Sequence, residues 1–259
     1  MESFYSKIQK SVNTIFNEKQ ITTIVSSKED KKIELINSVL NSENITEEIK
    51  TPSPNSIKID KKNNFYTVGK FYYLSENYKN MLFNINIKED IKYYLNIYDE
   101  EKLLGLLKNF NLSLKILDKC YLDLSDSELK KISIIIGLMV DVPILIFENP
   151  TSKLDLKSID VLCKQLKQLK RQGKIVIVNS FNTDFLLEIS NKIIIIDGTE
   201  ILENSKYEFF CNEKMLKKMN LKIPNIIKFI NMVKKEKNIK LKLCDNINDL
   251  IKDVYRNVK

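Results

Sequence analysis

Residues 143–147 read PILIF and are apolar at every position. A strand of this composition has no face for solvent, which is typical of the centre of a parallel sheet covered by helices on both sides. Apolar, β-rich runs alternate with helical segments along the chain, which predicts an α/β fold with a mostly parallel sheet. Strands are predicted at 21–25, 65–73, 143–147, 174–178 and 192–197, and helices at 31–40, 89–117, 127–140 and 157–172.

The chain can bury a sizeable core, since 43% of its 259 residues are hydrophobic. This length suits one α/β domain with an appendage, or two small domains. No apolar run reaches the roughly 18 residues that a membrane-spanning helix needs, and the first residues lack the order of a signal peptide. The four cysteines lie far apart, without metal-ligand spacing. We therefore expect four isolated thiols in a reducing cytoplasm and no metal site.

The net charge of +8 is compatible with nucleic acid, with an anionic membrane surface or with no specific partner. Lysines are spread among acidic residues, without an arginine cluster or an aromatic RNA-recognition motif. We interpret them as a solvated surface, with proximity to a membrane as a further use, and expect no nucleic acid partner.

The stretch from residue 124 to residue 155 reads LSDSELKKISIIIGLMVDVPILIFENPTSKLD. In order, spacing and expected secondary structure it resembles the signature helix, Walker B strand and D-loop of the ATP-binding cassette (ABC) ATPases. That family fold is a P-loop NTPase core, a mostly parallel sheet with helices. The signature positions are Leu124, Ser125, Asp126, Ser127 and Glu128, the Walker B positions are Glu148 and Asn149, and the D-loop positions are Ser152, Leu154 and Asp155.

Residues 21–35, ITTIVSSKEDKKIEL, occupy the place of the phosphate-binding strand, loop and helix of that family. Ser26, Glu29 and Lys31 stand where glycines are expected, Lys32 matches the lysine, and Ile33 replaces the hydroxyl residue. The family's Q-loop glutamine falls on Tyr73, and its switch histidine falls on Phe181.

The C-terminal part resembles the extension of energy-coupling factor (ECF) transporter ATPases, through Met215, Leu216, Leu221, Ile223 and Pro224. We therefore predict an ABC ATPase-like domain at 1–206, with a helical insert at about 72–140, and a C-terminal helical extension at 207–259. Phe4 or Tyr5 is a candidate for the aromatic face that stacks on adenine.

The phosphate loop is chemically unsuited to an anion. Glycines let successive backbone N–H groups converge on a phosphate, but this chain has no glycine before Gly69. A left-handed conformation costs a residue with a side chain about 1 to 2 kcal/mol, and Glu29 would add a carboxylate beside the triphosphate. Lys32 has two interpretations, a phosphate ligand or one more surface lysine at a helix start.

The metal and base positions are also altered. Ile33 has no oxygen for Mg²⁺, and Glu148 keeps a carboxylate one methylene longer than the family's aspartate. Asn149 has the shape of the general base without its basicity, and such a base contributes about 10² to 10⁴ in rate. Phe181 cannot bond a γ-phosphate, and Tyr73 cannot bind metal as an amide does. We therefore expect ATP and Mg²⁺, the ligands that the resemblance implies, to bind weakly or not at all.

The signature is altered too. Asp126 and Glu128 at a helix N-terminus stabilise the helix by a few tenths to 1 kcal/mol, but they oppose the phosphate of a partner subunit. The alternative interpretation of this segment is simply a well-capped helix.

The resemblance implies a degenerate ATP-binding subunit of an ECF-type importer, peripheral on the cytoplasmic face of the membrane. It would pair with a second ABC ATPase subunit, as a heterodimer, and dock on an integral membrane subunit through roughly residues 72–98. Three alternatives stay open: an ABC ATPase that hydrolyses ATP through Lys32 and Glu148, a regulatory or interaction protein without a transport role, and, as a distant fourth hypothesis, a nucleic-acid-binding protein.

Overall fold

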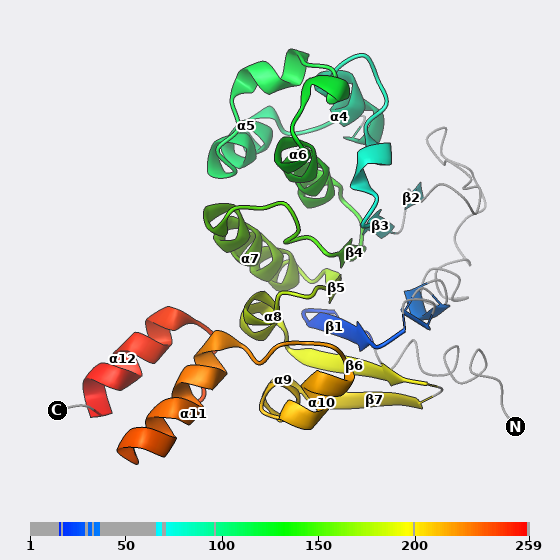
Figure 1. The fold of residues 1–259 in the computed structure, drawn as a ribbon. Coiled ribbons are helices and arrows are strands. Elements are labelled where there is room, and N and C mark those ends of the chain that lie inside the picture. Colours follow the sequence, from blue (N-terminus) through cyan, green and yellow to red (C-terminus); the bar gives the residue numbers. More distant parts are fainter. Residues whose placement is uncertain are drawn as a thin grey trace, which may run out of the picture.

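We describe the protein from a computed structural model, which covers residues 16, 18–28, 31, 32, 34–36, 66–68, 71–95, 97–198 and 200–257. Its strands form one seven-stranded sheet in the order β2-β3-β4-β5-β1-β6-β7. The four neighbouring pairs from β3 to β6 are parallel, and an antiparallel strand closes each edge. The predicted mostly parallel α/β sheet is confirmed, with residues 144–147 in an inner strand that pairs with β3 and with the central strand β5 (Figure 1).

The strands and helices of the described residues have the following bounds. The strands are β1 Ile21–Ser26, β2 Tyr66–Val68, β3 Phe71–Leu74, β4 Ile144–Glu148, β5 Ile175–Asn179, β6 Lys192–Asp197 and β7 Glu200–Ser205. The helices are α4 Ile87–Leu95, α5 Glu100–Asn109, α6 Asp126–Met139, α7 Leu156–Arg171, α8 Thr183–Ile189, α9 Lys206–Phe210, α10 Glu213–Lys218, α11 Asn225–Lys237 and α12 Ile247–Asn257, with 3₁₀ turns at Tyr78–Met81, Leu114–Asp118 and Tyr121–Asp123.

Alternate residues of the central strands enter two cores, as the two-residue repeat of a strand requires. Leu145 and Phe147 join the larger core, which contains residues of α6, α7, α8 and α9. Ile144 and Ile146 face the opposite side, where Leu35 and Ile36 pack. The sheet is therefore covered on both faces, and this explains why the first four residues of β4 are all apolar (Figure 1).

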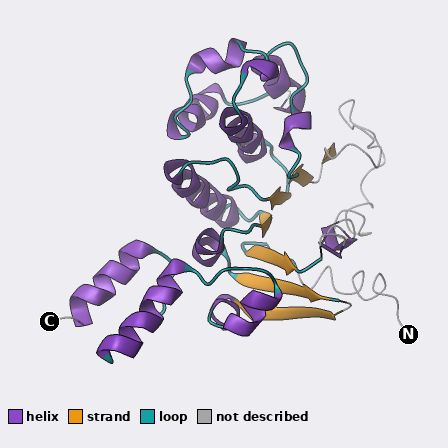
Figure 2. Cartoon of the chain, viewed as in Figure 1, coloured by secondary structure: helices purple, strands orange, loops and turns teal. Residues whose placement is uncertain are grey.

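The helices between β3 and β4 gather at one end of the sheet, and α11 and α12 lie toward the other end (Figure 2). At the first end, α6 packs closely against β3 of the sheet. Tyr72 is fully buried and donates a 2.7 Å hydrogen bond from Oη to the carbonyl oxygen of Ser133. A Cβ built on Gly137 would lie 2.3 Å from Cε1 of the Tyr72 ring, so this helix position requires glycine.

The structure differs from the sequence prediction in four elements. The predicted strand 65–73 is two antiparallel strands, β2 and β3, with Val68 paired to Phe71. The predicted helix 89–117 is divided into α4, α5 and a 3₁₀ turn, because Asp99 caps a new helix by accepting a bond from the Lys102 backbone N–H. The edge strand β7 and the short helix α8 were not predicted.

The remaining predicted elements agree with the structure to within about two residues at their ends, apart from helix 31–40, of which residues 31, 32 and 34–36 are described and helical. Gly173 and Gly198 both have positive φ, at 90° and 63°, as expected where a helix or strand must turn. The region after residue 207 is helical as predicted, but its division into a separate unit stays a prediction. Among the described residues, no helix is long and apolar enough to cross a membrane.

Candidate functional site

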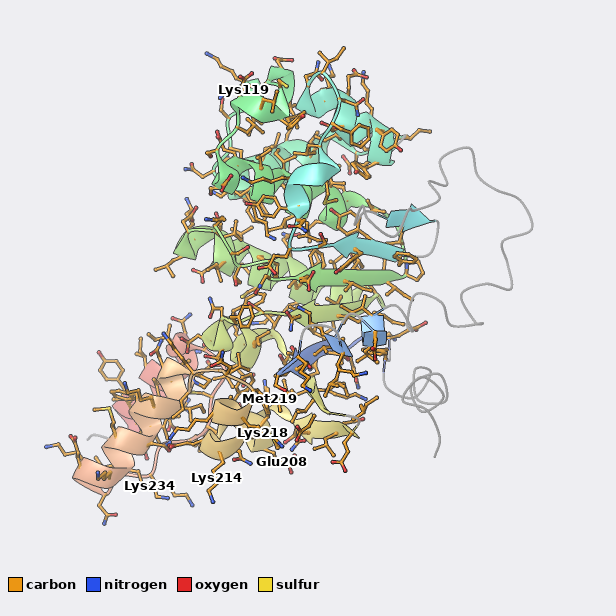
Figure 3. All side chains as sticks on the ribbon, turned by 45° about the vertical axis from the view of Figure 1, so that its right-hand side comes forward. Lys119, Glu208, Lys214, Lys218, Met219 and Lys234 are labelled. Carbon is orange, nitrogen blue, oxygen red and sulfur yellow. The ribbon has the colours of Figure 1, made fainter. Side chains whose placement is uncertain are left out.

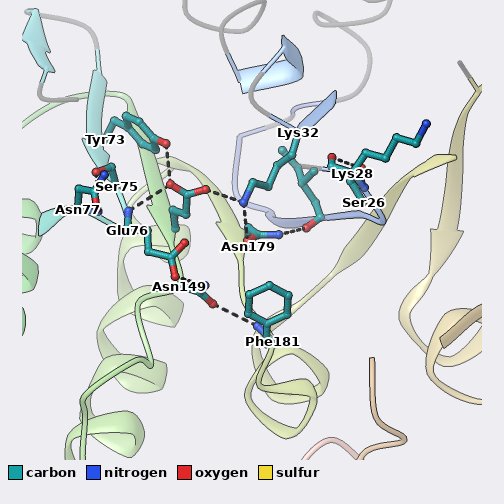
Figure 4. A network of polar contacts seen from close by, with 12 residues as sticks. Ser26, Lys28, Lys32, Tyr73, Ser75, Glu76, Asn77, Asn149, Asn179 and Phe181 are labelled. Carbon is teal, nitrogen blue, oxygen red and sulfur yellow. Dashed lines mark hydrogen bonds and ion pairs between the residues drawn. The ribbon is translucent and has the colours of Figure 1, made fainter. Parts of the chain in front are cut away.

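The predicted phosphate, metal and base positions meet at one edge of the sheet. Glu148 and Asn179 are the last residues of β4 and β5 and lie in register with each other. Carboxyl ends of parallel strands share an edge, so β1, β3, β4 and β5 bring their terminal side chains together there. Figure 4 shows the resulting polar network, with Lys32 reaching in from the helical residues after β1.

The centre of this network is a buried ion pair. The Nζ of Lys32 lies 2.6 Å from Oε1 of Glu148, and the two side chains are 5% and 6% exposed. Lys32 Nζ also donates to Oδ1 of Asn179 at 3.4 Å, and the Asn179 amide is fixed by donating to the carbonyl oxygen of Ile24 at 2.9 Å. The interpretation of Lys32 as a surface lysine is therefore wrong, because its side chain is buried and its amine contacts the end of β4.

The second carboxylate oxygen of Glu148 is also occupied by protein groups. Tyr73 donates its hydroxyl to Glu148 Oε2 at 2.8 Å, and the backbone N–H of Glu76 donates to the same oxygen at 3.2 Å. Burial alone would raise the pKa of Glu148, but the Lys32 ammonium, the Tyr73 hydroxyl and the Glu76 amide outweigh it. The pKa of Glu148 therefore lies below its usual range, and this buried carboxylate stays ionised.

The Walker B Asn149 and the switch position are linked beside this pair. Asn149 has a left-handed backbone, with φ of 44°, and its side-chain amide donates to Oε1 of Glu76 at 3.1 Å. Its Oδ1 accepts a 3.3 Å bond from the backbone N–H of Phe181, whose ring is 63% exposed. Both polar ends of Asn149 thus serve to join β4 to the segments after β3 and β5 (Figure 4).

The phosphate-loop positions are described only in part. Ser26 ends β1, and its hydroxyl donates to the Lys28 carbonyl at 2.8 Å and accepts from the Lys28 N–H at 3.2 Å. Lys31 is partly exposed and pairs with Glu34 at 2.7 Å. Glu29 and Ile33 lie outside the described residues, as do Phe4, Tyr5 and Gly69.

The signature positions form a helix cap. Ser125 caps α6, accepting the Glu128 N–H, while Glu128 Oε2 accepts the Ser125 N–H at 2.9 Å, which completes a capping box. Asp126 pairs with Lys79 at 2.7 Å on the surface, Ser127 lies in the first turn of α6, and Leu124 is buried. The expectation of a well-capped helix is confirmed.

The D-loop positions lie between β4 and α7. Asp155 caps α7 by accepting the Ser158 N–H at 2.8 Å, and its other oxygen lies 2.8 Å from Lys131 Nζ on α6. Bonds from Lys131 and Ser158 hold the pKa of Asp155 below its usual range. Ser152 donates its hydroxyl to the Asn149 carbonyl, and Leu154 is half-buried.

Sequence reasoning missed three residues of this region. Asn179 ends β5 and Glu76 lies shortly after β3, and a polar residue at the carboxyl end of a parallel strand is the pattern that would have indicated them. Lys130 is fully buried on α6, with its Nζ 4.5 Å from the centre of the Tyr78 ring and with no hydrogen-bond partner among the described residues. Burial lowers the pKa of Lys130 to about 8, although Glu76 and Glu148 act in the opposite direction.

The chain is similar in sequence to curated ATP-binding proteins of transporters. It is 29% identical over 184 residues to the energy-coupling factor transporter ATP-binding protein EcfA2 of Mycoplasmoides gallisepticum, covering 68% of this chain and 57% of the relative. It is 30% identical over 179 residues to the EcfA3 protein of the same description from Oenococcus oeni, covering 65% and 60%. The chain thus spans about three fifths of the length of these relatives. No family model matches the chain.

Among solved structures, the chain is similar to one described as the ATP-binding subunit of an ABC transporter. The TM-score is 0.59 at 13% sequence identity, covering 79% of this chain and 88% of that one. The structure titled RNase-L Inhibitor gives 0.58 at 15% identity, covering 82% and 44%. At these identities the similarity shows a shared fold.

Proposed function

The chain belongs to the ATP-binding cassette ATPases, and on that premise we propose that it is a transporter subunit whose own site does not hydrolyse ATP. The observation that carries this proposal is the ion pair between Lys32 and Glu148. In the family these two positions serve the phosphates and the metal, whereas here each neutralises the other.

The chemistry of the donor set argues against a bound Mg²⁺. A magnesium ion requires free oxygen ligands in near-octahedral geometry. The two oxygens of Glu148 are committed to Lys32, Tyr73 and the Glu76 amide, and the described residues contain no cluster of three acidic, cysteine or histidine side chains. As arranged, these residues do not fit the metal, and no hydrolytic step follows from them.

The base position supports the same proposal. Asn149 cannot accept a proton from water, and both ends of its side-chain amide already bond protein groups, Glu76 and the Phe181 N–H. Restoring ATP hydrolysis would require a general base at position 149 and separation of the Lys32–Glu148 ion pair. We propose that the fold instead transmits motion that a second, active ATPase subunit generates, in an ECF-type importer.

In this role the chain would lie on the cytoplasmic face of a membrane. It would form a heterodimer with the second ATPase and contact an integral membrane subunit through residues 72–98. Exposed apolar side chains on this segment are available for such a contact, among them Phe83, Ile85 and Ile97, at 51%, 87% and 90% exposure.

The test is phosphate release by the assembled complex. Replacing the general base of the partner ATPase should abolish ATP turnover completely, since this chain contributes no active base. Residual turnover that disappears on introducing Glu148→Gln would show that this chain hydrolyses ATP, and the proposal would be wrong.

A further inference from the structure

The outer side of the two C-terminal helices carries an apolar groove of about 600 Å³. Its walls come from α11 and α12. Tyr255 is 75% exposed and Ile247 is 62% exposed, although both are large and apolar. Seven apolar residues line the groove: Ile226, Phe229, Ile247, Leu250, Ile251, Val254 and Tyr255.

The groove is formed in advance by the packing beneath it. A separate small core holds the two helices together, formed by Ile230, Leu241, Cys244 and Leu250. Asp253, buried in α12, accepts a 2.7 Å bond from the backbone N–H of Lys242 and so fixes that helix to the preceding segment. Leu250 belongs both to this core and to the floor of the groove, and Ile226 and Val254 pack against the core, whereas Phe229, Ile247, Ile251 and Tyr255 stay exposed.

Most of the net positive charge of the chain lies in the C-terminal segment that carries this groove. The C-terminal segment, residues 207–259, contains 13 Lys and Arg against 6 Asp and Glu, so it holds +7 of the whole chain's net charge of +8. Lys228, Lys252 and Arg256 are exposed and directly follow or precede groove residues in the two helices, and Lys252 forms a 3.1 Å surface ion pair with Asp249. Figure 3 shows further lysines of the segment, including Lys214, Lys218 and Lys234, projecting from α10 and α11.

The apolar lining and the positive charge of the segment together indicate which kind of partner the groove binds. A second copy of the chain would bring another +7 segment against the first, which like-charge repulsion opposes. A bilayer presents a plane and fills a concave groove poorly. If the proposed function holds, the membrane also lies beyond the helices between β3 and β4, away from α11 and α12 (Figure 1). An amphipathic helix fits both the shape and the apolar lining.

We propose that this groove binds an acidic amphipathic helix of a partner protein. Apolar side chains spaced at i, i+3 or i+4 and i+7 on that helix fill the space between Phe229, Ile251 and Tyr255. Its carboxylates face the surrounding lysines and Arg256. The site is distinct from the sheet edge that carries Lys32 and Glu148, so the groove and the nucleotide site are tested separately.

The probe is a labelled synthetic 18-residue helix with leucine at these spacings and glutamate on its other faces. Its binding to the full chain is followed by fluorescence anisotropy, with a second peptide in which lysine replaces every glutamate. Two groove variants are compared, Ile251→Ser and the double variant Lys252→Glu/Arg256→Glu. The matched control is Leu122→Ser, which changes a 76% exposed leucine in the 3₁₀ turn Tyr121–Asp123, outside both the groove and the proposed membrane-subunit contact.

The acidic peptide should bind saturably and more weakly as salt rises, and the lysine peptide should not bind. Ile251→Ser and the charge-reversed variant should each weaken binding about tenfold, as losses above 1 kcal/mol at an interface centre do, and Leu122→Ser should leave it unchanged. Three results would overturn the proposal: equal binding of both peptides, binding only to phosphatidylglycerol vesicles, or self-association in sedimentation that Ile251→Ser abolishes. Each of these three results is independent of whether the chain is a transporter subunit, so failure of this proposal is distinguishable from failure of the proposed function.

Discussion

The strongest test of the site uses the buried ion pair itself. Replacing Lys32 with methionine leaves the Glu148 carboxylate buried without its counter-ion. Removing one partner of such a pair typically costs about 3 to 5 kcal/mol, because the remaining charge is uncompensated. Here Tyr73 and the Glu76 amide still bond Glu148, so we expect the lower end, about 3 kcal/mol.

A second substitution separates the loss of the pair from a general packing defect. Glu148→Gln in the Lys32→Met background removes the stranded charge and keeps an oxygen that accepts from Tyr73. The double variant should therefore recover most of the lost stability. The neighbouring Lys31→Met is the matched control, since its pair with Glu34 is partly exposed and should contribute no more than about 1 kcal/mol.

Urea unfolding monitored by circular dichroism measures all four proteins. The pH dependence adds a check, because the folded pKa of Glu148 lies below its ordinary value of 4.5. The stability from the pair is fully present above about pH 4.5 and is lost as the pH falls through the folded pKa. Equal stability of Lys32→Met and wild type, with no recovery in the double variant, would refute the ion pair.

Further predictions concern packing and titration elsewhere in the chain. The buried Lys130 has a pKa of about 8 against 10.5 unfolded, so the unfolded state binds more protons between these values and stability should rise with pH there, by roughly 2 to 3 kcal/mol relative to Lys130→Met; parallel unfolding free energies of the two proteins from pH 8 to 10 would contradict this. Gly137→Ala drives a methyl group into the Tyr72 ring and should lower stability by about 1 to 3 kcal/mol despite the helix propensity of alanine, measured by thermal unfolding. Asp155→Ala removes both the cap of α7 and the partner of Lys131 and should cost about 1 to 2 kcal/mol in urea, whereas a neutral effect would mean that the cap is redundant.

Local patterns predicted most of the fold. Residues 144–147 could be assigned to a buried strand because a run that is apolar at every position has no face for solvent. The start of α6 could be assigned because Ser125 and Glu128 stand at capping-box spacing. The strand β7 was missed because most of its residues are exposed and carry no apolar face. The break between α4 and α5 depends on a single cap at Asp99, within a stretch whose apolar residues keep helical spacing.

The site was harder to predict than the fold. The motifs indicated which residues stand at the phosphate, metal and base positions, but the pairing of Lys32 with Glu148 joins residues far apart in sequence. In the sequence, a lysine at the start of a helix has the pattern of a surface residue. Only the packing of that helix against the sheet brings Lys32 to the end of β4. Lys130 posed the same difficulty, since one of two adjacent lysines near the start of α6 gives no signal that its amine is buried.

The central claim is that the protein's own ion pair occupies the phosphate and metal site. Its most direct test is the binding of a fluorescent ATP analogue with Mg²⁺ to the purified chain, with Lys32→Ala as the comparison. We predict no saturable binding at millimolar nucleotide for either protein. Tight binding by the wild-type chain that Lys32→Ala abolishes would contradict the claim, because Lys32 would then serve phosphate in preference to Glu148.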